Sequence, residues 1–452
     1  MKIIVVGCGK IGTTVIESLA KEGHDVVAID NDQAAVDNIR DIYDVMCICG
    51  NGANYDTLSE AGISSAEMFV AVTGSDELNM LSCIIARKMG AAHTAARVRN
   101  PEYNDKNLGF MRQQIGLSIS INPELLTAQE IFNVLKIPAA VNTETFSRRN
   151  FEMIELKLSE GSVLDGISLV DMRKKYKANF LVCVVNRGEE VYIPDGNFVL
   201  KSGDRIGVAA TISEIHKFLK MLGIMRKQAK NIMILGASRT AYYLAKMLIA
   251  SGSSVKIIDS DPSVCSEVAA DLPEATVING DGTEQEILLE EGIRSTDAFV
   301  ALTGMDEENI LVSCFAASQN VPKVITKVNR NELASMAEKL GLDCIVSPKK
   351  TVSGVISKYA RALQNSLGSN IETLYKLMDG KVEALEFNVQ PDFKYIGVPL
   401  KEMRFKPNIL IAGIISGKKA MIPSGDDCFA AGDKVVVIAK DRIMDDLSEI
   451  ME

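Results

Sequence analysis

The sequence predicts an α/β protein with two doubly wound parallel sheets, each followed by a small α+β domain. Short apolar runs alternate with helical patterns through residues 2–98, which is typical of βαβ units around a parallel sheet. A glycine-rich turn follows the first of these runs. The same pattern returns in the second half of the chain, so we expect a tandem duplication.

The repeat is long and nearly keeps its register. Residues 3–32 return as residues 232–261, and residues 50–80 return as residues 280–310. Two fainter repeats relate the segments that follow, 151–173 to 382–404 and 191–210 to 420–439. We therefore predict four domains, at residues 1–137, 138–224, 228–368 and 369–452, with a polar, basic link at residues 223–231.

Each large domain is expected to have the order strand, helix, strand. In the first of them we predict strands at residues 2–6, 25–30, 45–49, 68–73 and 93–98. The segments between these runs carry apolar residues at helical spacing, and Gly23 and Gly252 are expected to end the first helix of each copy. The small domains have short strands, tight turns and a single helix, which we predict at residues 169–176 of the first.

The composition excludes several classes of protein. The chain has 452 residues, a net charge of -10 and no long run of Lys and Arg, so we expect no binding to nucleic acid. Nine cysteines without metal-ligand spacing, together with three histidines, argue for a reducing cytosol and against a metal site. Because no apolar stretch reaches the ~18 residues that span a bilayer, we expect no direct insertion into a membrane.

The glycine-rich turn has the spacing of a dinucleotide site on a Rossmann-like domain. Gly7 allows a tight turn after the first strand, Gly9 lets the backbone approach a pyrophosphate, and Gly12 lets the helix pack near the sheet. The helix that begins near Ile11 directs free N–H groups and its positive end at the phosphates. For Lys10 two alternatives stay open, contact with a phosphate or exposure to water.

A carboxylate ends the second predicted strand. Asp30 stands where such domains accept hydrogen bonds from the ribose hydroxyls, and Asn31 follows it. No arginine follows in the string "IDND", and a carboxylate repels a 2′-phosphate. The sequence therefore favours NAD(H) or an adenine mononucleotide over NADP.

Further loops fall at strand ends, where ligands of such sheets lie. Asn51 and Gly52 follow the third strand and are expected to edge the adenosine. Thr73 and Gly74 follow the fourth and either face the phosphates or second ribose, or belong to an ordinary helix cap. Arg97 ends the fifth strand and either pairs with a phosphate or is a solvated strand end.

The second copy has lost part of the glycine motif. Ser238 replaces Gly9 and puts a side chain where a pyrophosphate would approach, while Ala241 replaces Gly12. Two alternatives stay open: the second site holds an adenosine-like group in a weaker or different pose, or it has lost binding. The candidate contacts in this copy are Gly236, Ser238, Arg239, Thr240, Asp259, Asp281, Gly282, Thr303 and Lys327.

The strings "GCGKIG", "AIDND", "GNGANYDTL", "AVTGSDELNM" and "ARVRNPEY", in a chain that repeats itself, resemble the regulatory subunits of bacterial Trk potassium-uptake systems. These subunits are built from tandem RCK (also called KTN) domains, and the resemblance covers essentially the whole chain. By motif match it implies nucleotide contacts for Gly7, Cys8, Gly9, Lys10, Ile11, Asp30, Thr73, Gly74 and Arg97.

The resemblance also implies a function. It implies binding of NAD(H) and of ATP or ADP, and homo-oligomers in which dimers assemble toward a tetrameric ring. It further implies a cytoplasmic location, peripheral to the inner face of the cell membrane. There the ring would gate potassium uptake through a membrane channel subunit of the TrkH type.

We expect no enzymatic activity. A hydride-transfer enzyme needs an acid or base near the nicotinamide, and the small domains offer only His216, on an apparent surface helix. An NAD-dependent oxidoreductase stays the first alternative. The second is a potassium-channel regulator with a cyclic-dinucleotide effector on a small domain, for which the sequence has no phosphate motif.

Overall fold

The structure is a computed structural model. It describes residues 1–100, 103, 116–137, 140–146, 151–176, 179–188, 190–224, 229–366, 371–378, 381–417, 419–440, 444 and 446–452. Part of the predicted link at 223–231, and part of the string "ARVRNPEY", lie outside this set. The predicted domain boundaries fall at or beside such residues and stay predictions.

The first large domain is a parallel sheet in the order β3-β2-β1-β4-β5-β6. Its strands are β1 (Lys2–Val6), β2 (Asp25–Asp30), β3 (Met46–Cys49), β4 (Met68–Ala71), β5 (His93–Arg97) and β6 (Ile119–Ile121). The helices are α1 (Lys10–Lys21), α2 (Gln33–Ile42), α3 (Tyr55–Glu60) and α4 (Asp76–Lys88). All five predicted strands are present, and β6 is an addition that the apolar pattern did not predict.

The second large domain repeats this topology in the order β14-β13-β12-β15-β16-β17. Its strands are β12 (Asn231–Leu235), β13 (Ser254–Asp259), β14 (Thr276–Asn279), β15 (Ala298–Ala301), β16 (Lys323–Lys327) and β17 (Ile345–Val346). The helices are α9 (Arg239–Ala250), α10 (Pro262–Asp271), α11 (Gln285–Glu290), α12 (Asp306–Ser318) and α13 (Asn331–Lys339). The expected duplication is therefore present in the fold.

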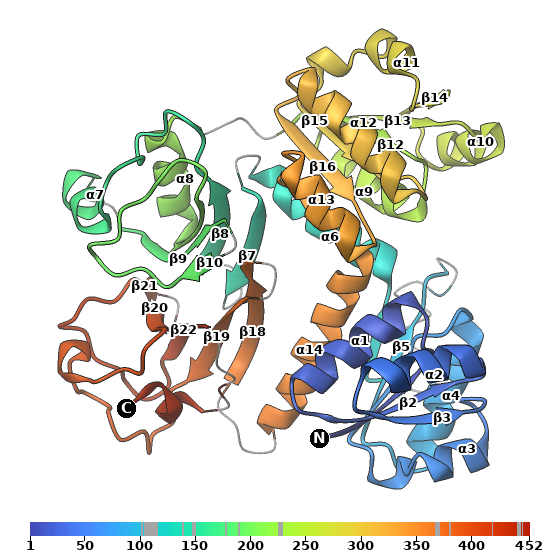
Figure 1. The fold of residues 1–452 in the computed structure, drawn as a ribbon, viewed down its shortest axis with the longest axis horizontal. Coiled ribbons are helices and arrows are strands. Elements are labelled where there is room, and N and C mark those ends of the chain that lie inside the picture. Colours follow the sequence, from blue (N-terminus) through green and yellow to red (C-terminus); the bar gives the residue numbers. More distant parts are fainter. Residues whose placement is uncertain are drawn as a thin grey trace.

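Two helices are exchanged between the halves of the chain. Helix α6 (Pro123–Lys136) follows the first sheet, yet its apolar side chains, such as Ile131 and Leu135, lie in the core of the second large domain. Helix α14 (Pro348–Ser366) follows the second sheet and inserts Val352, Ile356 and Ala360 into the core of the first. Figure 1 shows both helices between the two sheets. The two large domains therefore complete each other's cores.

The small domains are antiparallel sheets, in the orders β10-β9-β11-β8-β7 and β18-β19-β22-β20-β21. The first module contains β7 (Asn142–Phe146), β8 (Phe151–Lys157), α7 (Leu169–Tyr176), β9 (Leu181–Arg187), β10 (Glu190–Tyr192), β11 (Arg205–Ala210) and α8 (Ile212–Met221). The second contains β18 (Ile371–Leu377), β19 (Val382–Asn388), β20 (Ile409–Ser416), β21 (Lys419–Met421) and β22 (Lys434–Lys440).

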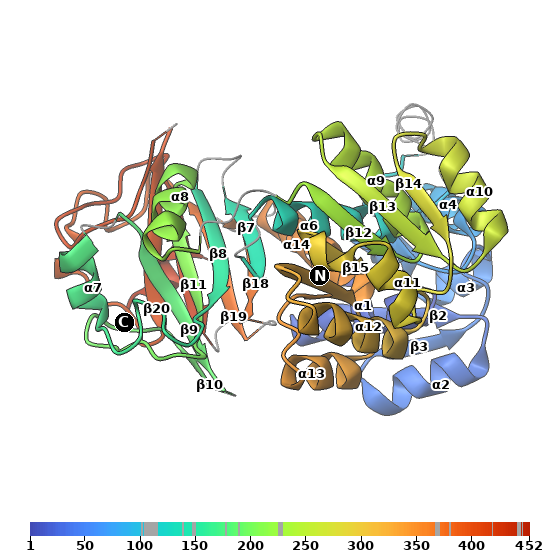
Figure 2. The ribbon, with the colours of Figure 1, turned by 90° about the horizontal axis from the view of Figure 1, so that it is seen from above.

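The two small modules share one apolar core. Phe151 and Val184 of the first module pack with Ala384 and Val436 of the second. Figure 2 shows the two sheets as a layer beside the large domains. The predicted helix at 169–176 is confirmed as α7, but α8 corrects the expectation of one helix per module. The helices in the described part of the second module are only short 3₁₀ turns.

A helix that crosses a membrane needs about 20 mostly apolar residues. No helix within the residues that the structure describes is long and apolar enough to cross a membrane.

Candidate nucleotide-binding site

A cavity of about 970 Å³ opens at the carboxyl ends of the first parallel sheet, the edge where ligands of such sheets lie. Its volume suits a nucleotide. Both halves of the chain line it, so we call it the shared cavity. The predicted first-site residues that line it are Gly7, Gly9, Lys10, Ile11, Asp30, Asn31, Asn51, Gly52, Thr73, Gly74 and Arg97.

The glycine turn presents an open helix end to the cavity. Gly7 has a φ of +101°, and a Cβ there would lie 2.9 Å from the backbone nitrogen of Thr73, so the position requires glycine. Gly9 is the N-cap of α1 and has no side chain to cap the helix. A Cβ on Gly9 would meet no described atom within 4 Å. The first N–H groups of α1 are therefore left for an anion.

The carboxylate of Asp30 is fixed by the same turn. Its Oδ2 accepts the backbone N–H of Cys8 at 2.6 Å, and its Oδ1 accepts that of Asp32 at 3.0 Å. Cys8 itself does not line the cavity, because its side chain packs in the core below the turn. Burial, with the charge of Asp30, raises the pKa of the Cys8 thiol to about 12. The contribution of Cys8 is thus through its backbone.

The loop after β3 closes one side of the cavity. The side chain of Asn51 accepts the backbone N–H of Ala53 at 2.9 Å, which holds the loop in a turn. A Cβ on Gly52 would lie 2.2 Å from the side chain of Val6, so only glycine lets the loop pack against β1. This packing leaves the backbone of the loop at the cavity wall.

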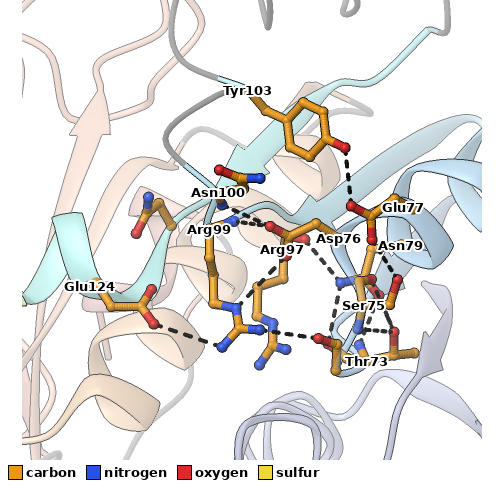
Figure 3. A network of polar contacts seen from close by, with 12 residues as sticks. Thr73, Ser75, Asp76, Glu77, Asn79, Arg97, Arg99, Asn100, Tyr103 and Glu124 are labelled. Carbon is orange, nitrogen blue, oxygen red and sulfur yellow. Dashed lines mark hydrogen bonds and ion pairs between the residues drawn. The ribbon is translucent and has the colours of Figure 1, made fainter. Parts of the chain in front are cut away.

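The loop after β4 is held by a network that Figure 3 shows. Asn79 on α4 accepts the backbone N–H of Thr73 at 2.8 Å and donates to the carbonyl of Arg97 at 2.9 Å. Ser75 caps α4 by accepting the N–H of Leu78 at 3.1 Å. The loop therefore caps a helix and also lines the cavity, while its contact with phosphates or a second ribose stays a prediction.

Two arginines lie side by side at the end of β5 (Figure 3). Arg99 forms ion pairs with Asp76 at 3.8 Å and Glu124 at 4.0 Å. Burial, together with the charge of Arg99, lowers the pKa of Arg97. The Nε atom of Arg97 is buried and has no hydrogen-bond partner within the described part of the chain. Arg97 is therefore half-buried at the cavity wall, and its pairing with a phosphate stays a prediction.

The second half repeats the backbone of the site. Gly236 has a φ of +91°, and Asp259 accepts the N–H of Ala237 at 2.6 Å, as Asp30 does for Cys8. Thr303 donates its N–H to Asn309 at 2.9 Å. Asp281 accepts the N–H of Thr283 at 2.9 Å, and Gly282 packs on Leu235, so the matching loop is also preserved.

The two halves differ at the helix end. The hydroxyl of Ser238 accepts the N–H of Ala241 at 3.4 Å and so caps α9. One of the N–H groups that the start of α9 leaves without an intrahelical partner is therefore already satisfied. Of the predicted second-site residues, Ser238, Arg239, Thr240 and Lys327 line the shared cavity. Gly236, Asp259, Asp281, Gly282 and Thr303 do not.

The charged side chains that line the shared cavity are mainly basic. Six basic side chains outnumber two carboxylates, those of Asp30 and Glu124. Sequence reasoning missed Glu124 and Lys349, because they reach the cavity through the exchanged helices. The repeated Pro123 and Pro348, which begin these helices, were the available signal. The basic residues are Lys10, Arg97, Arg99, Arg239, Lys327 and Lys349.

Family models match most of the chain. The TrkA-N domain matches residues 3–122 and 232–348, and the TrkA-C domain matches residues 153–223 and 384–452. The Trk system potassium uptake protein TrkA homolog of Archaeoglobus fulgidus is 32% identical over 450 residues, 100% of both chains. The TrkA protein of Haemophilus influenzae is 27% identical over 449 residues, 98% of this chain and 96% of that protein.

Solved structures share the fold. The GsuK RCK domain has a TM-score of 0.62 at 16% identity, over 97% of this chain and 92% of that chain. The GsuK channel bound to NAD has a TM-score of 0.61 at 18% identity, over 97% of this chain and 77% of that chain. The paired TrkA-N and TrkA-C matches and the full-length relatives go further than fold: the chain belongs to the TrkA family of potassium-uptake regulatory subunits, which are not enzymes.

Proposed function

We propose that this protein is a nucleotide-sensing regulatory subunit of a Trk-type potassium transporter. It binds NAD(H) and ATP or ADP in the shared cavity, and the bound nucleotide changes the shape of a ring assembly. That change gates potassium uptake through a membrane channel subunit of the TrkH type. The ring would lie in the cytoplasm, peripheral to the cell membrane.

The observation that carries the proposal is the open end of α1 beside Asp30. A ribose bound at the Asp30 carboxylate would place its phosphates at the free N–H groups after Gly9. Phosphates further along the ligand would then lie toward Arg97 and Arg239, which belong to different halves of the protein. This arrangement supports a ligand that carries several phosphate charges.

A ligand that contacts both halves is suited to regulation. It binds more tightly when the halves are positioned to contact it together, so its occupancy shifts the balance between arrangements of the halves. The TrkA family of the chain and the named relatives support the potassium-uptake context. The GsuK channel, which shares the fold, has been solved bound to NAD and bound to ADP.

Calorimetric titration of NADH, ATP and ADP tests the nucleotide part of the proposal. Asp30→Ala is expected to weaken binding by about ten- to hundredfold, the usual range for hydrogen bonds to a charged group. Asp259→Ala is the matched control, because it removes the equivalent loop hydrogen bonds outside the cavity lining. Wild-type protein that binds none of the three, or Asp30→Ala protein with unchanged affinity, would contradict the proposal.

Potassium flux tests the regulatory part. Wild-type protein added to liposomes containing the membrane subunit is expected to make flux depend on nucleotide, and Asp30→Ala to remove that dependence. Flux that responds equally with both proteins would contradict gating through this site.

A further inference from the structure

Helices α1 and α14 both begin at the shared cavity and run side by side (Figure 1). Lys10 at the start of α1 and Lys349 at the start of α14 line the cavity. Both helices end far from it: α14 spans 19 residues, about 28 Å at the helical rise. A displacement at the nucleotide can therefore be carried along this pair.

A ladder of polar contacts joins the two helices at three successive turns. Ser353 donates to the carbonyl of Thr14 at 3.2 Å, and the hydroxyls of Ser357 and Ser18 lie 3.0 Å apart. Both serines of α14 are buried. Each contact lies four residues further along both helices than the one before, so the helices run in the same direction and their register is fixed.

Arg361 forms the last contact of the ladder and also reaches a third element. Its Nε donates to Glu22 at 3.0 Å, and its guanidinium donates to Glu383 of β19 at 3.0 Å. The Arg361 residue is 6% exposed, and the Glu22 side chain is 4% exposed. One buried guanidinium thus joins the end of α1, the end of α14 and the second small module.

Among the described residues, the equivalent helix pair in the other half, α6 and α9, has no such ladder. Counted from Pro123 and Pro348, Ala128, Phe132 and Lys136 of α6 are the counterparts of Ser353, Ser357 and Arg361. Ala128 and Phe132 pack in an apolar cluster with α9. Lys136 is exposed, lies over the ring of Phe132 and contacts Asn133. Within the described residues, a buried arginine that links such a helix pair to a small module is therefore found in one half.

We propose that Arg361 is a positioning residue that couples nucleotide occupancy at α1 to the second small module. The proposal rests on the proposed nucleotide site. A shift of α1 moves Glu22, and the buried Arg361 is expected to follow, because separating the two members of a buried ion pair is costly. Glu383 and β19 then follow Arg361. The second small module is thus the part that the nucleotide reaches first through this contact.

Hydrogen exchange measured by mass spectrometry on the full chain tests this coupling. In wild-type protein, ATP or NADH is expected to change exchange both in peptides around residues 7–12 and in peptides around residues 382–388. In Arg361→Gln, the change around 7–12 is expected to persist and the change around 382–388 to be lost. Arg361→Lys is expected to restore part of it, since it keeps the charge but not the double contact.

Matched variants separate coupling from simple loss of stability. Lys136→Gln alters the counterpart of Arg361 and is expected to leave both responses unchanged. Glu383→Ala removes only the link to β19, keeps Arg361 paired with Glu22, and gives the same test if Arg361→Gln does not fold. Glu152→Ala on β8 is the control for Glu383→Ala, because the sequence repeat places Glu152 at the matching position of the first small module.

The outcomes distinguish the two proposals. If wild-type peptides around residues 7–12 do not respond to any nucleotide, the proposed function fails. If they respond while residues 382–388 do not, or if the response of residues 382–388 survives in Glu383→Ala and Arg361→Gln, the nucleotide site stands and the coupling through Arg361 is overturned.

Discussion

The two glycine turns of this protein have nearly the same backbone and opposite consequences. Gly7 and Gly236 share a positive φ, and each turn donates an N–H to an aspartate. Two residues later the first turn has Gly9, which leaves the end of α1 open, whereas the second has Ser238, which caps α9. The comparison teaches that the scaffold is preserved while one side chain decides whether the start of the helix is capped.

The second turn has nevertheless kept a place in the site. Arg239 follows Ser238 directly and lines the shared cavity together with residues of the first half. The exchanged helices bring the two turns to one cavity. The second half therefore supplies charge to the first site, while its own aspartate lies outside the lining.

The largest effect is expected from exchanging the residue that differs between the turns. Gly9→Ser would cap α1 and place a side chain in the open space of the cavity, so nucleotide affinity is expected to fall by roughly ten- to hundredfold. Ser238→Gly is the reciprocal variant and is expected to change unfolding free energy by only a few tenths of a kcal/mol. Calorimetry measures the nucleotide affinity of Gly9→Ser, and thermal unfolding measures the stability of Ser238→Gly. Unchanged affinity in Gly9→Ser would break the comparison.

A smaller effect is expected from the arginine that the second half supplies. Arg239→Met should weaken binding by roughly five- to tenfold, and more for ATP than for NADH, because ATP carries more phosphate charge. Lys246→Met is the control, since it removes the same charge from an exposed position of α9 outside the cavity lining. Equal losses in both variants would show a general charge effect instead of a contact.

A smaller, pH-dependent effect is expected at the position that holds Arg97 in the first half and Lys327 in the second. Burial lowers the pKa of Lys327 below its usual value, although Asp306 and Glu124 oppose this. As pH rises toward that lowered pKa, Lys327 loses its proton and nucleotide affinity is expected to fall severalfold. Lys327→Arg, which copies Arg97, should keep affinity constant, because arginine stays charged. Nucleotide affinity is measured for both proteins at increasing alkaline pH. If affinity changes with pH in the same way in both, the lost proton of Lys327 does not cause the change.

The smallest effect concerns the thiol of Cys8, which lies beneath the first turn. The second turn has Ala237 at this position. Burial raises the pKa of the Cys8 thiol to about 12, so the less reactive protonated form prevails near neutral pH. Iodoacetamide is therefore expected to modify the exposed Cys49 well before Cys8, as measured by peptide mapping. Equal rates at the two cysteines would mean that the turn opens readily.

Local patterns predicted much of this molecule. The apolar runs predicted the strands of the first large domain, and the glycine spacing with Asp30 predicted residues that do lie around one cavity. These features depend on neighbours in sequence, such as a turn that only Gly7 allows. The loss of the second glycine was visible too, although the cap that Ser238 makes was not.

Contacts between distant segments were not predictable in the same way. The periodicity of α6 shows that it has an apolar face, but many surfaces can cover such a face, and Ile131 gives no sign that the second domain covers it. Glu124 and Lys349 reach the cavity only because of that exchange. The string "TGSDELN", which returns as "TGMDEEN", did hold a signal for Asn79 and Asn309, the residues that support the loops.

The exchange of α6 and α14 also constrains how the two halves diverged. Neither large domain has a closed core without a helix from the other, so separate halves would expose apolar surface and would pair with any copy that offered the missing helix. Within one chain the correct partner is always tethered alongside. Pairing is then guaranteed by covalent connection, and one turn was free to acquire Ser238 without any need for two identical subunits to tolerate the same change.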